Sequence, residues 1–387
     1  MGNKLGNTGT SRLVMVWLLG LVSLMMAVFA AVLMTEPGQM LDIERSWIVQ
    51  YHEYRVLYGI VVVSLFLVFA VLGWRQAVLG PKLVGVFGVV VGLALFASNS
   101  LLDWFFPSLQ RDAVYVSVVD GDEQLNDDEV VYAVELGGEA VAYPRRFMMI
   151  PHIAGKSIGG QDVVMTYCAL SNLPVAYETQ LAGQDTELGV LIQTNNNLVL
   201  YDDISGEVIQ QITGQTEFGA PKMKTYANQM MSWGSFKTLY PEGEVFVYPY
   251  DRWLDHALLA VFDDGLKQQY DPEQGPMFPT LELADDRLPQ KEAIWGLDLN
   301  GEQIAFARSF FVDQPIYNMT LGNQPLVLRF DVDYETLGVF YRKTADEVQD
   351  VDIFGNTRSG RLSRVPVHNG VFWMVWSHFY PDTQVKG

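Results

Sequence analysis

The sequence predicts an N-terminal anchor of three transmembrane helices followed by a β-rich α+β region that is internally duplicated, with one short helix in each repeat. Three observations predict this class: three apolar runs of membrane-spanning length, alternating strand patterns in the rest of the chain, and one pattern that occurs twice. We expect the anchor at residues 1–106, a first repeat at 107–250, a linker or long loop at 251–291, and a second repeat at 292–387.

The three apolar runs are Leu13 to Met34, Val56 to Trp74, and Leu83 to Leu102, and none contains Asp, Glu, Lys or Arg. A helix needs about 20 apolar residues to cross a bilayer. Transport pathways usually place ionisable groups inside the membrane. We therefore expect these helices only to anchor the chain, with the lipid bilayer as their partner.

Basic residues near the helix ends predict the orientation of this multi-pass chain in the cell membrane. Lys4 and Arg12 lie before the first run, and Arg75 and Lys82 lie between the second and third, whereas the loop after the first run is acidic. Lysine and arginine favour the cytoplasmic side. The large C-terminal region is then extracytoplasmic. Cleavage of the first helix as a signal peptide would leave that region on the same side.

The acidic composition limits the partners of the outer region. The 387 residues carry a formal net charge of -20, which repels nucleic acid phosphates and argues against DNA or RNA binding. Cys168 is the only cysteine, so no intrachain disulfide can form. A single thiol in an oxidising compartment is expected to be either buried or in use.

The duplicated pattern aligns Leu136–Tyr177 with Leu299–Phe340 without a gap, and Arg145 with Arg308. Each copy reads as two strands joined at Gly-Gly or Asn-Gly, followed by a further strand. The pattern leaves open whether the copies close into one unit or form two domains.

Each copy also ends in a short aromatic helix that a proline terminates, because proline cannot continue a helix. The alignment pairs Trp233 with Trp376, and Pro241 with Pro381.

The differences between the copies point to chemistry in the first one. Cys168 aligns with Asp331, His152 with Pro315, and Met165 with Leu328. A thiolate, an imidazole and a thioether suit a transition metal such as copper, or zinc when oxygen ligands join them. The candidate metal ligands are therefore Cys168, His152 and Met165, although their spacing matches no short ligand motif. The alternative is that Cys168 is a small buried side chain and that the methionines fill the core.

Two other kinds of chemistry remain open in the same segment. His152 could serve as the base for a Cys168 nucleophile, which would make the protein a thiol-dependent enzyme with otherwise unknown catalytic residues. Arg145 and Arg146 could clamp an anion through paired hydrogen bonds. Because Arg308 repeats Arg145, a structural ion pair is the alternative role for Arg145.

Three motifs of the first repeat resemble a prokaryotic family, number three-one-seven-nine in the series of domains of unknown function. They are "MTYCALSNLP", "NLVLYDDISGEVIQQITG" and "WGSFKTLYPEGEVFV". The resemblance implies no activity. It singles out Arg145, His152, Thr166, Tyr167, Cys168, Gly214 and Trp233 as characteristic positions. Of these, we take Arg145, Thr166, Tyr167 and Trp233 as candidate ligand-binding residues.

The chain departs from the pattern of this family at two positions. Ala169 replaces a common proline, and Ser171 stands where many members have a second cysteine. The second change removes a C-x-x-C pair and weakens a dithiol role.

The sequence therefore favours ligand or metal binding at a Cys168–His152 site in a membrane-anchored extracytoplasmic domain. The alternatives are a thiol-dependent enzyme and an envelope scaffold that contacts other proteins through exposed aromatic residues such as Trp253 and Trp295. The substrate and any cofactor are unknown from the residues alone.

Overall fold

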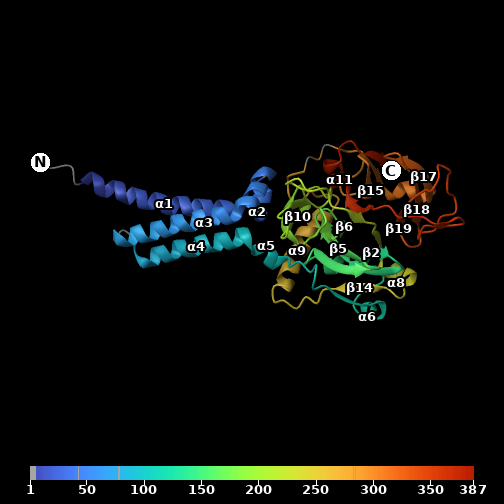
Figure 1. Ribbon diagram of the computed structural model, residues 1–387, viewed down its shortest axis with the longest axis horizontal. Coiled ribbons are helices and arrows are strands. Elements are labelled where there is room, and N and C mark those ends of the chain that lie inside the picture. The colour runs from blue at the N-terminus through green and yellow to red at the C-terminus, as the bar shows by residue number, and fades with distance from the viewer. Residues whose placement is uncertain (1–5, 42, 77–78, 282, 284) are drawn as a thin grey trace. The chain divides into compact units, whose positions relative to one another are not determined.

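Three long apolar helices precede a region built mainly of strands, so the predicted fold class is confirmed (Figure 1). The computed structural model describes residues 6–387 except 42, 77–78, 282 and 284. The chain divides into residues 1–104 and residues 105–387, and each unit is described by itself.

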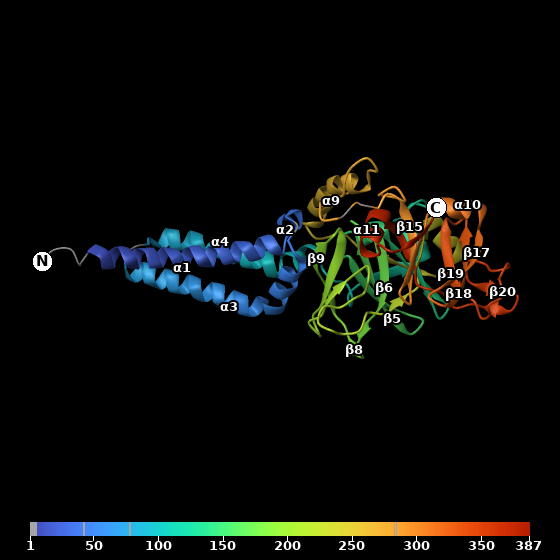
Figure 2. The ribbon, with the colours of Figure 1, turned by 90° about the horizontal axis from the view of Figure 1, so that it is seen from above.

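The first unit is helical, and its three long helices lie side by side in both views (Figures 1 and 2). The segments Ser11–Leu33, Arg45–Arg75 and Pro81–Asn99 are long and apolar enough to cross a membrane. The helices are α1 (Gly6–Leu33), α2 (Glu36–Met40), α3 (Arg45–Arg75), α4 (Pro81–Asn99) and α5 (Leu101–Phe105), the last of which ends at the start of the second unit.

Small residues and hydrogen bonds join these helices. Gly20 of α1 faces the ring of Phe69 in α3, where a Cβ atom would come within 2.6 Å of that ring. The Ser23 hydroxyl donates to the Val62 carbonyl oxygen at 3.0 Å. Apolar burial gives little drive for association inside lipid, so close packing and such bonds hold the helices together.

The first half of the second unit contains three sheets. One has the order β1 (Val114–Ser117), β14 (Glu244–Val247), β3 (Glu139–Pro144), β2 (Val130–Leu136), β13 (Gln229–Ser232). Another has the order β12 (Thr225–Tyr226), β6 (Leu173–Glu178), β5 (Gln161–Cys168), β4 (Ile153–Ile158). The third is β11 (Val208–Gln210), β10 (Asn197–Asp202), β9 (Leu188–Thr194), and a small hairpin joins β7 (Gln180–Leu181) to β8 (Gln184–Asp185). The helices of this half are α6 (Val118–Asp122), α7 (Arg145–Met148) and α8 (Trp233–Leu239).

The second half has two corresponding sheets and a hairpin. The sheets are β22 (His368–Phe372), β15 (Ala293–Leu299), β16 (Glu302–Phe306), β23 (Gln384–Lys386), and β17 (Ile316–Leu321), β18 (Gln324–Asp331), β19 (Thr336–Tyr341). The hairpin is β20 (Asn356–Thr357) with β21 (Gly360–Arg361), and the helices are α10 (Arg308–Asp313) and α11 (Trp373–Phe379).

The two halves share their order of elements and their strand pairing. The run β2-β3-α7-β4-β5-β6 has the same form as β15-β16-α10-β17-β18-β19. After α8 and α11, the chain returns in each half as a strand parallel to β3 or β16. The short helices α6, α7 and α10 were not predicted, so the first half contains two short helices more than expected and the second half one more.

One residue pair in the predicted alignment is wrong. The Trp233 amide donates to the Glu129 carbonyl oxygen at 2.8 Å, and the Trp373 amide donates to the Glu292 carbonyl oxygen at 2.9 Å. Glu129 and Glu292 are equivalent in the gapless register, so Trp233 corresponds to Trp373 and not to Trp376. The pairing of Trp233 with Trp376 fails because it implies a different register from that of the two prolines.

The segment between the two halves contains helix α9 (Asp255–Tyr270), which lies within residues 251–291, the predicted linker or long loop. The side chain of Gln269 is wholly buried and donates to the Leu170 carbonyl oxygen at 2.5 Å. Farther along, the Asn196 amide donates to the Phe278 carbonyl oxygen at 2.7 Å. The segment is therefore packed against the first half.

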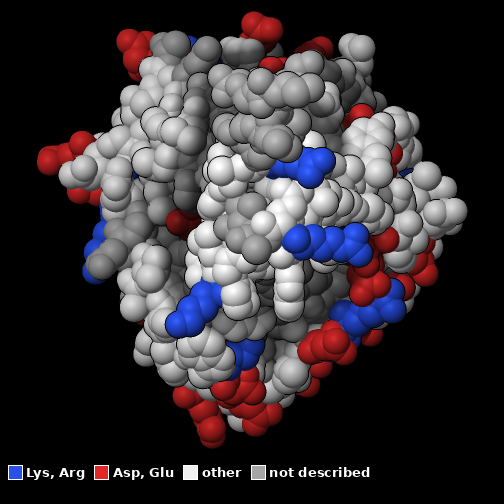
Figure 3. Space-filling model, turned by 90° about the vertical axis from the view of Figure 1, so that its left-hand side faces the viewer, with Lys and Arg blue, Asp and Glu red and all other residues white. Residues whose placement is uncertain are grey.

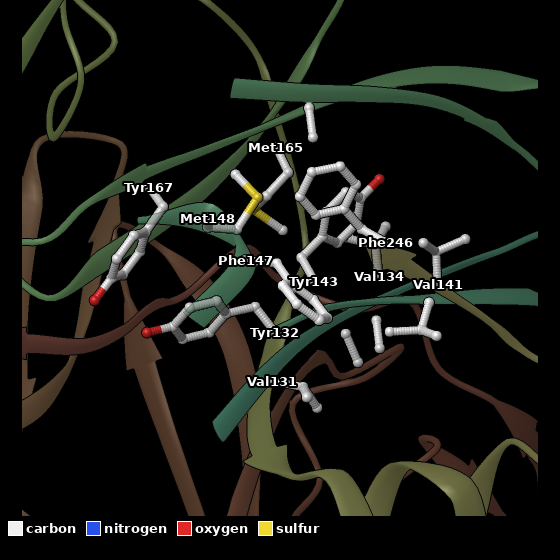
Figure 4. Close-up of a cluster of buried hydrophobic side chains, with 14 of the residues drawn as sticks. Val131, Tyr132, Val134, Val141, Tyr143, Phe147, Met148, Met165, Tyr167 and Phe246 are labelled. Carbon is white, nitrogen blue, oxygen red and sulfur yellow. The ribbon is translucent and has the colours of Figure 1, made fainter. Parts of the chain in front are cut away.

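A large apolar core of the first half includes Met148, Met165 and Phe246 (Figure 4). Tyr132 and Tyr167 lie at one edge of this core, and their hydroxyl groups point to the same side, away from Phe246. The core therefore presents two phenol groups at its edge.

The surface of the chain reflects its excess of acidic residues, of which there are 45 against 25 basic ones. Both acidic and basic side chains are visible on the face shown in Figure 3.

Candidate functional site

Cys168 ends strand β5, and its side chain is wholly buried. The backbone N–H groups of Leu170, Ser171 and Leu198 interact with the Cys168 sulfur, and the Ser171 hydroxyl donates to the Cys168 carbonyl oxygen at 3.5 Å. The thiol itself approaches the Asn196 carbonyl oxygen at 3.9 Å. Burial raises the pKa of the thiol, and the hydrogen bonds oppose this shift without cancelling it.

The equivalent residue of the second repeat explains this arrangement. The Asp331 carboxylate accepts hydrogen bonds from the amides of Asp333 and Tyr334 at 3.1 and 3.2 Å. These two residues align with Leu170 and Ser171 in the gapless register. The side chain at this position therefore has the same role in each repeat. It accepts from the backbone N–H groups of the turn that follows the strand.

His152 is buried and neutral. Its backbone φ of 57° lies in the left-handed region, and its ring stacks on Phe106 with centroids 4.7 Å apart. The ring nitrogen Nδ1 lies 3.2 Å from the Met148 carbonyl oxygen, which requires Nδ1 to carry the proton. Burial lowers the pKa of His152 to about 4.

The proposed metal ligands do not share one environment. Met165 and Cys168 are three residues apart in β5, so their side chains leave opposite faces of the strand. Met165 belongs to the large apolar core. Among the described residues, no three His, Cys, Asp or Glu side chains are grouped so that they could hold a metal ion. The geometry thus gives the copper or zinc hypothesis no support.

Thr166 and Trp233, two of the ligand-binding candidates, make hydrogen bonds within the fold. The Thr166 hydroxyl donates to the Val175 carbonyl oxygen at 3.0 Å and accepts from the Gln211 amide at 3.1 Å. The Trp233 ring nitrogen donates to Asp122 at 3.0 Å. Both side chains are wholly buried, and these contacts stabilise the framework.

Arg145, at the start of α7, occupies a different setting. Burial lowers the pKa of its half-buried guanidinium, but the nearby Tyr132, Tyr167 and Tyr270 raise that pKa above its ordinary value. The guanidinium also lies 5.8 Å from the centre of the Tyr270 ring, within cation–π range. Within the part of the chain that the structure describes, Arg145 forms no ion pair with a carboxylate. Its neighbour Arg146 differs, because it pairs with Glu129 at 3.3 Å.

Asn172 organises the three phenols around Arg145. Its side-chain oxygen lies 3.2 Å from the Tyr167 hydroxyl, 3.4 Å from the Tyr270 hydroxyl and 3.5 Å from the Tyr132 hydroxyl. Its side-chain nitrogen donates to the Gly370 carbonyl oxygen at 2.7 Å. The cluster formed by Arg145, Tyr132, Tyr167, Asn172 and Tyr270, here called the arginine–tyrosine site, thus joins the first repeat, α9 and the second repeat.

In the second repeat, the positions equivalent to Arg145 and Asn172 form an ion pair. Arg308, the equivalent of Arg145, forms a two-point ion pair with Glu335, with Nε donating to Oε2 at 2.7 Å. Glu335 aligns with Asn172 in the gapless register, and both residues have left-handed backbone angles, φ 48° and 53°. The first repeat therefore has an amide where the second has the carboxylate that neutralises its arginine.

The phenols are also specific to the first repeat. Tyr132 and Tyr167 pack with ring centroids 5.4 Å apart, and the equivalent Trp295 and Phe330 pack at the same 5.4 Å separation. The hydroxyl groups are thus additions to a shared aromatic pair. Trp295 is only 4% exposed, so the expectation that it forms an exposed contact surface is wrong, whereas Trp253 is 77% exposed.

The sequence predictions included Arg145 and Tyr167 but missed Tyr132 and Tyr270 as site residues. The alignment of Asn172 with Glu335 could have pointed to the site. The arginine is present in both repeats, but the acidic residue at position 335 is replaced by an amide at position 172. Tyr270 had no such signal, since it comes from α9 and has no counterpart in the duplicated pattern.

Comparison with known proteins places most of the chain in one family. Residues 105–383 match the model of a family described as "Protein of unknown function (DUF3179)". No match was found among curated proteins or among solved structures.

His152 predicts a loss of stability in acid. Its pKa is about 4 in the folded chain against an ordinary value of 6.5, so the unfolded state binds the proton first as the pH falls. The stabilisation is complete above about pH 7, and about 3 kcal/mol is lost as the pH falls to about 4. We expect His152→Asn, which tolerates the left-handed backbone, to reduce this loss in denaturant unfolding of the full chain in detergent. His256→Asn, at an exposed histidine, is the control. Equal acid sensitivity of wild type and His152→Asn would contradict this account.

Cys168 predicts an unusual order of substitution costs. Cys168→Ala leaves the N–H donors around the sulfur unpaired and should lower the free energy of unfolding by about 1–3 kcal/mol. Cys168→Ser should cost less, because a hydroxyl oxygen still accepts from them. Denaturant unfolding of the full chain measures both. A larger cost for serine than for alanine would indicate a purely apolar pocket, and rapid labelling of the native thiol would show that it is not sheltered.

Proposed function

The chain belongs to the DUF3179 family of proteins of unknown function, and we propose that it is a membrane-anchored module that binds a small anionic ligand at the arginine–tyrosine site. The observation that carries this proposal is the difference between Arg145 and Arg308. The second arginine has the Glu335 carboxylate, whereas the first has no carboxylate partner among the described residues and has three tyrosines nearby.

The surroundings of Arg145 suit an external anion. A half-buried guanidinium offers five N–H donors in a fixed plane and remains charged at all physiological pH values. Tyr132 and Tyr270 bring hydroxyl groups into the same cluster, where both contact the Asn172 oxygen. An anion bound there gains more than at an exposed arginine, because burial reduces screening by water.

The Cys168 thiol supports this proposal less directly than the arginine does. Its pKa is raised by burial, so it is protonated near neutral pH and is a poor nucleophile. His152 donates through Nδ1 to a backbone carbonyl and stacks on Phe106. These features favour ligand binding over thiol-dependent catalysis, with Cys168 holding the turn that carries Asn172.

We further propose that the second unit lies outside the cytoplasm. Lys4 lies before the first candidate span and Arg12 in its first turn, and Arg75 and Lys82 lie at the adjoining ends of the second and third spans. With these residues on the cytoplasmic side, an odd number of crossings places residues 105–387 on the other side. The anchored module would then sample ligands of the envelope or the medium.

Anion binding is tested by substituting the two equivalent arginines. We expect acetate, benzoate, phosphate or sulfate to stabilise the full chain in detergent at constant ionic strength, relative to chloride. At ten times the dissociation constant, the gain in unfolding free energy is about 1.4 kcal/mol. Arg145→Gln should abolish the gain, and Arg308→Gln, the matched control, should preserve it. An equal gain in wild type and Arg145→Gln for every anion would refute the proposal.

The orientation is tested by fusing reporters after Gly387. An enzyme that is active only outside the cytoplasm should be active there, and one that needs the cytoplasm should be silent. Activity of the cytoplasmic reporter would place the second unit on the inner side.

A further inference from the structure

We propose that the ligand of the arginine–tyrosine site is a monocarboxylate and that Asn172 is the residue that leaves the site open to it. This inference rests on the proposed anion binding at Arg145. It concerns the chemical class of the ligand and the residue that selects it.

The second repeat contains an arginine–carboxylate pair of the kind that we propose for Arg145 and its ligand. Arg308 presents Nε and a terminal nitrogen to the two oxygens of Glu335, in a side-on, two-point geometry. A planar carboxylate fits the planar guanidinium in this way. Arg145 begins α7 as Arg308 begins α10, and among the described residues no carboxylate pairs with it.

Residue 172 occupies the position from which Glu335 supplies its carboxylate in the second repeat. Asn172 and Glu335 occupy equivalent turns with nearly the same φ, 53° and 48°. Asn172 has a shorter side chain, and that side chain is committed to the Gly370 carbonyl oxygen at 2.7 Å and to the tyrosine hydroxyls. We therefore expect the carboxylate of a ligand to pair with Arg145 as Glu335 pairs with Arg308. The ligand would lie beside the Asn172 amide and would not displace it.

The charge of the site favours one negative charge over two. Arg145 is the single cation in the cluster, and the other donors are neutral phenols. A phosphate dianion would bring a second charge that nothing in the cluster neutralises, and its partial desolvation would be costly. The net charge of the chain, -20, also opposes a dianion more strongly than a monoanion.

The hydroxyl groups complete the coordination of a carboxylate. Each carboxylate oxygen accepts more than one hydrogen bond, and Arg145 supplies only one to each in the two-point geometry. The Tyr132 and Tyr270 hydroxyls donate to the Asn172 oxygen at 3.5 and 3.4 Å. Because each hydroxyl has one proton, we expect it to turn from Asn172 to one of the remaining positions when a carboxylate binds. The equivalent of Tyr132 in the second repeat, Trp295, carries no hydroxyl. The added phenols therefore mark the first repeat as the binding copy.

The test first compares the binding of different anions, and then introduces a glutamate at position 172 to occupy Arg145. Acetate and benzoate are the carboxylate probes, and phosphate and sulfate are the comparison anions, all titrated into the full chain in detergent by calorimetry. We expect both carboxylates to bind in an Arg145-dependent manner and at least tenfold more tightly than phosphate or sulfate. Asn172→Glu should weaken carboxylate binding at least tenfold, because the new side chain pairs with Arg145 as Glu335 pairs with Arg308.

Asn172→Gln is the matched control, since glutamine has the length of glutamate without its charge, and it should weaken binding less than Asn172→Glu. Glu335→Gln should leave binding unchanged. Equal losses in the two Asn172 variants would overturn the role of residue 172. Phosphate or sulfate binding that depends on Arg145 and exceeds carboxylate binding would overturn the ligand class and leave the proposed function standing. This comparison of anions in the wild type decides the ligand class even if Asn172→Glu does not fold. If no anion binds through Arg145, the proposed function fails as well.

Discussion

The hydrogen bond from Asn172 to the Gly370 carbonyl oxygen constrains much of the second unit. It joins the turn after β5 to the second repeat at 2.7 Å, while the Asn172 oxygen holds Tyr167 and Tyr270. A buried carbonyl oxygen needs a donor, and a carboxylate at position 172 would offer none. Packing of the two repeats thus favours an amide at this position, and the amide leaves Arg145 without the internal partner that Arg308 keeps.

The duplication supports the interpretation that Arg145 lacks an internal partner, because the second repeat provides a direct comparison. Cys168 and Asp331 cap equivalent turns, Tyr132 and Trp295 pack on equivalent rings, and only the chemical groups differ. What the copies share is explained by the framework. Among the differences, the lost carboxylate and the added phenols lie around one guanidinium, which is why the arginine, rather than the sheltered thiol, carries the proposed function.

Much of the fold followed from the sequence, and less of the site did. Apolar length predicted the three helices, and the gapless register predicted equivalent strands such as β5 and β18, because both signals are local. Tyr270 could not be placed, since it meets Tyr167 across 103 residues through the docking of α9. The donors around Cys168 depend on how a turn directs its backbone N–H groups, which residue type alone does not reveal.

An experimental structure of the full chain with bound 4-bromobenzoate tests the central claim most directly, because the anomalous signal of bromine locates the ligand. The account predicts a carboxylate lying side-on against Arg145, within hydrogen-bond distance of Tyr132 or Tyr270, and no such ligand at Arg308. An Arg145 side chain paired with a carboxylate of the protein itself, with no ligand beside it, would contradict the account.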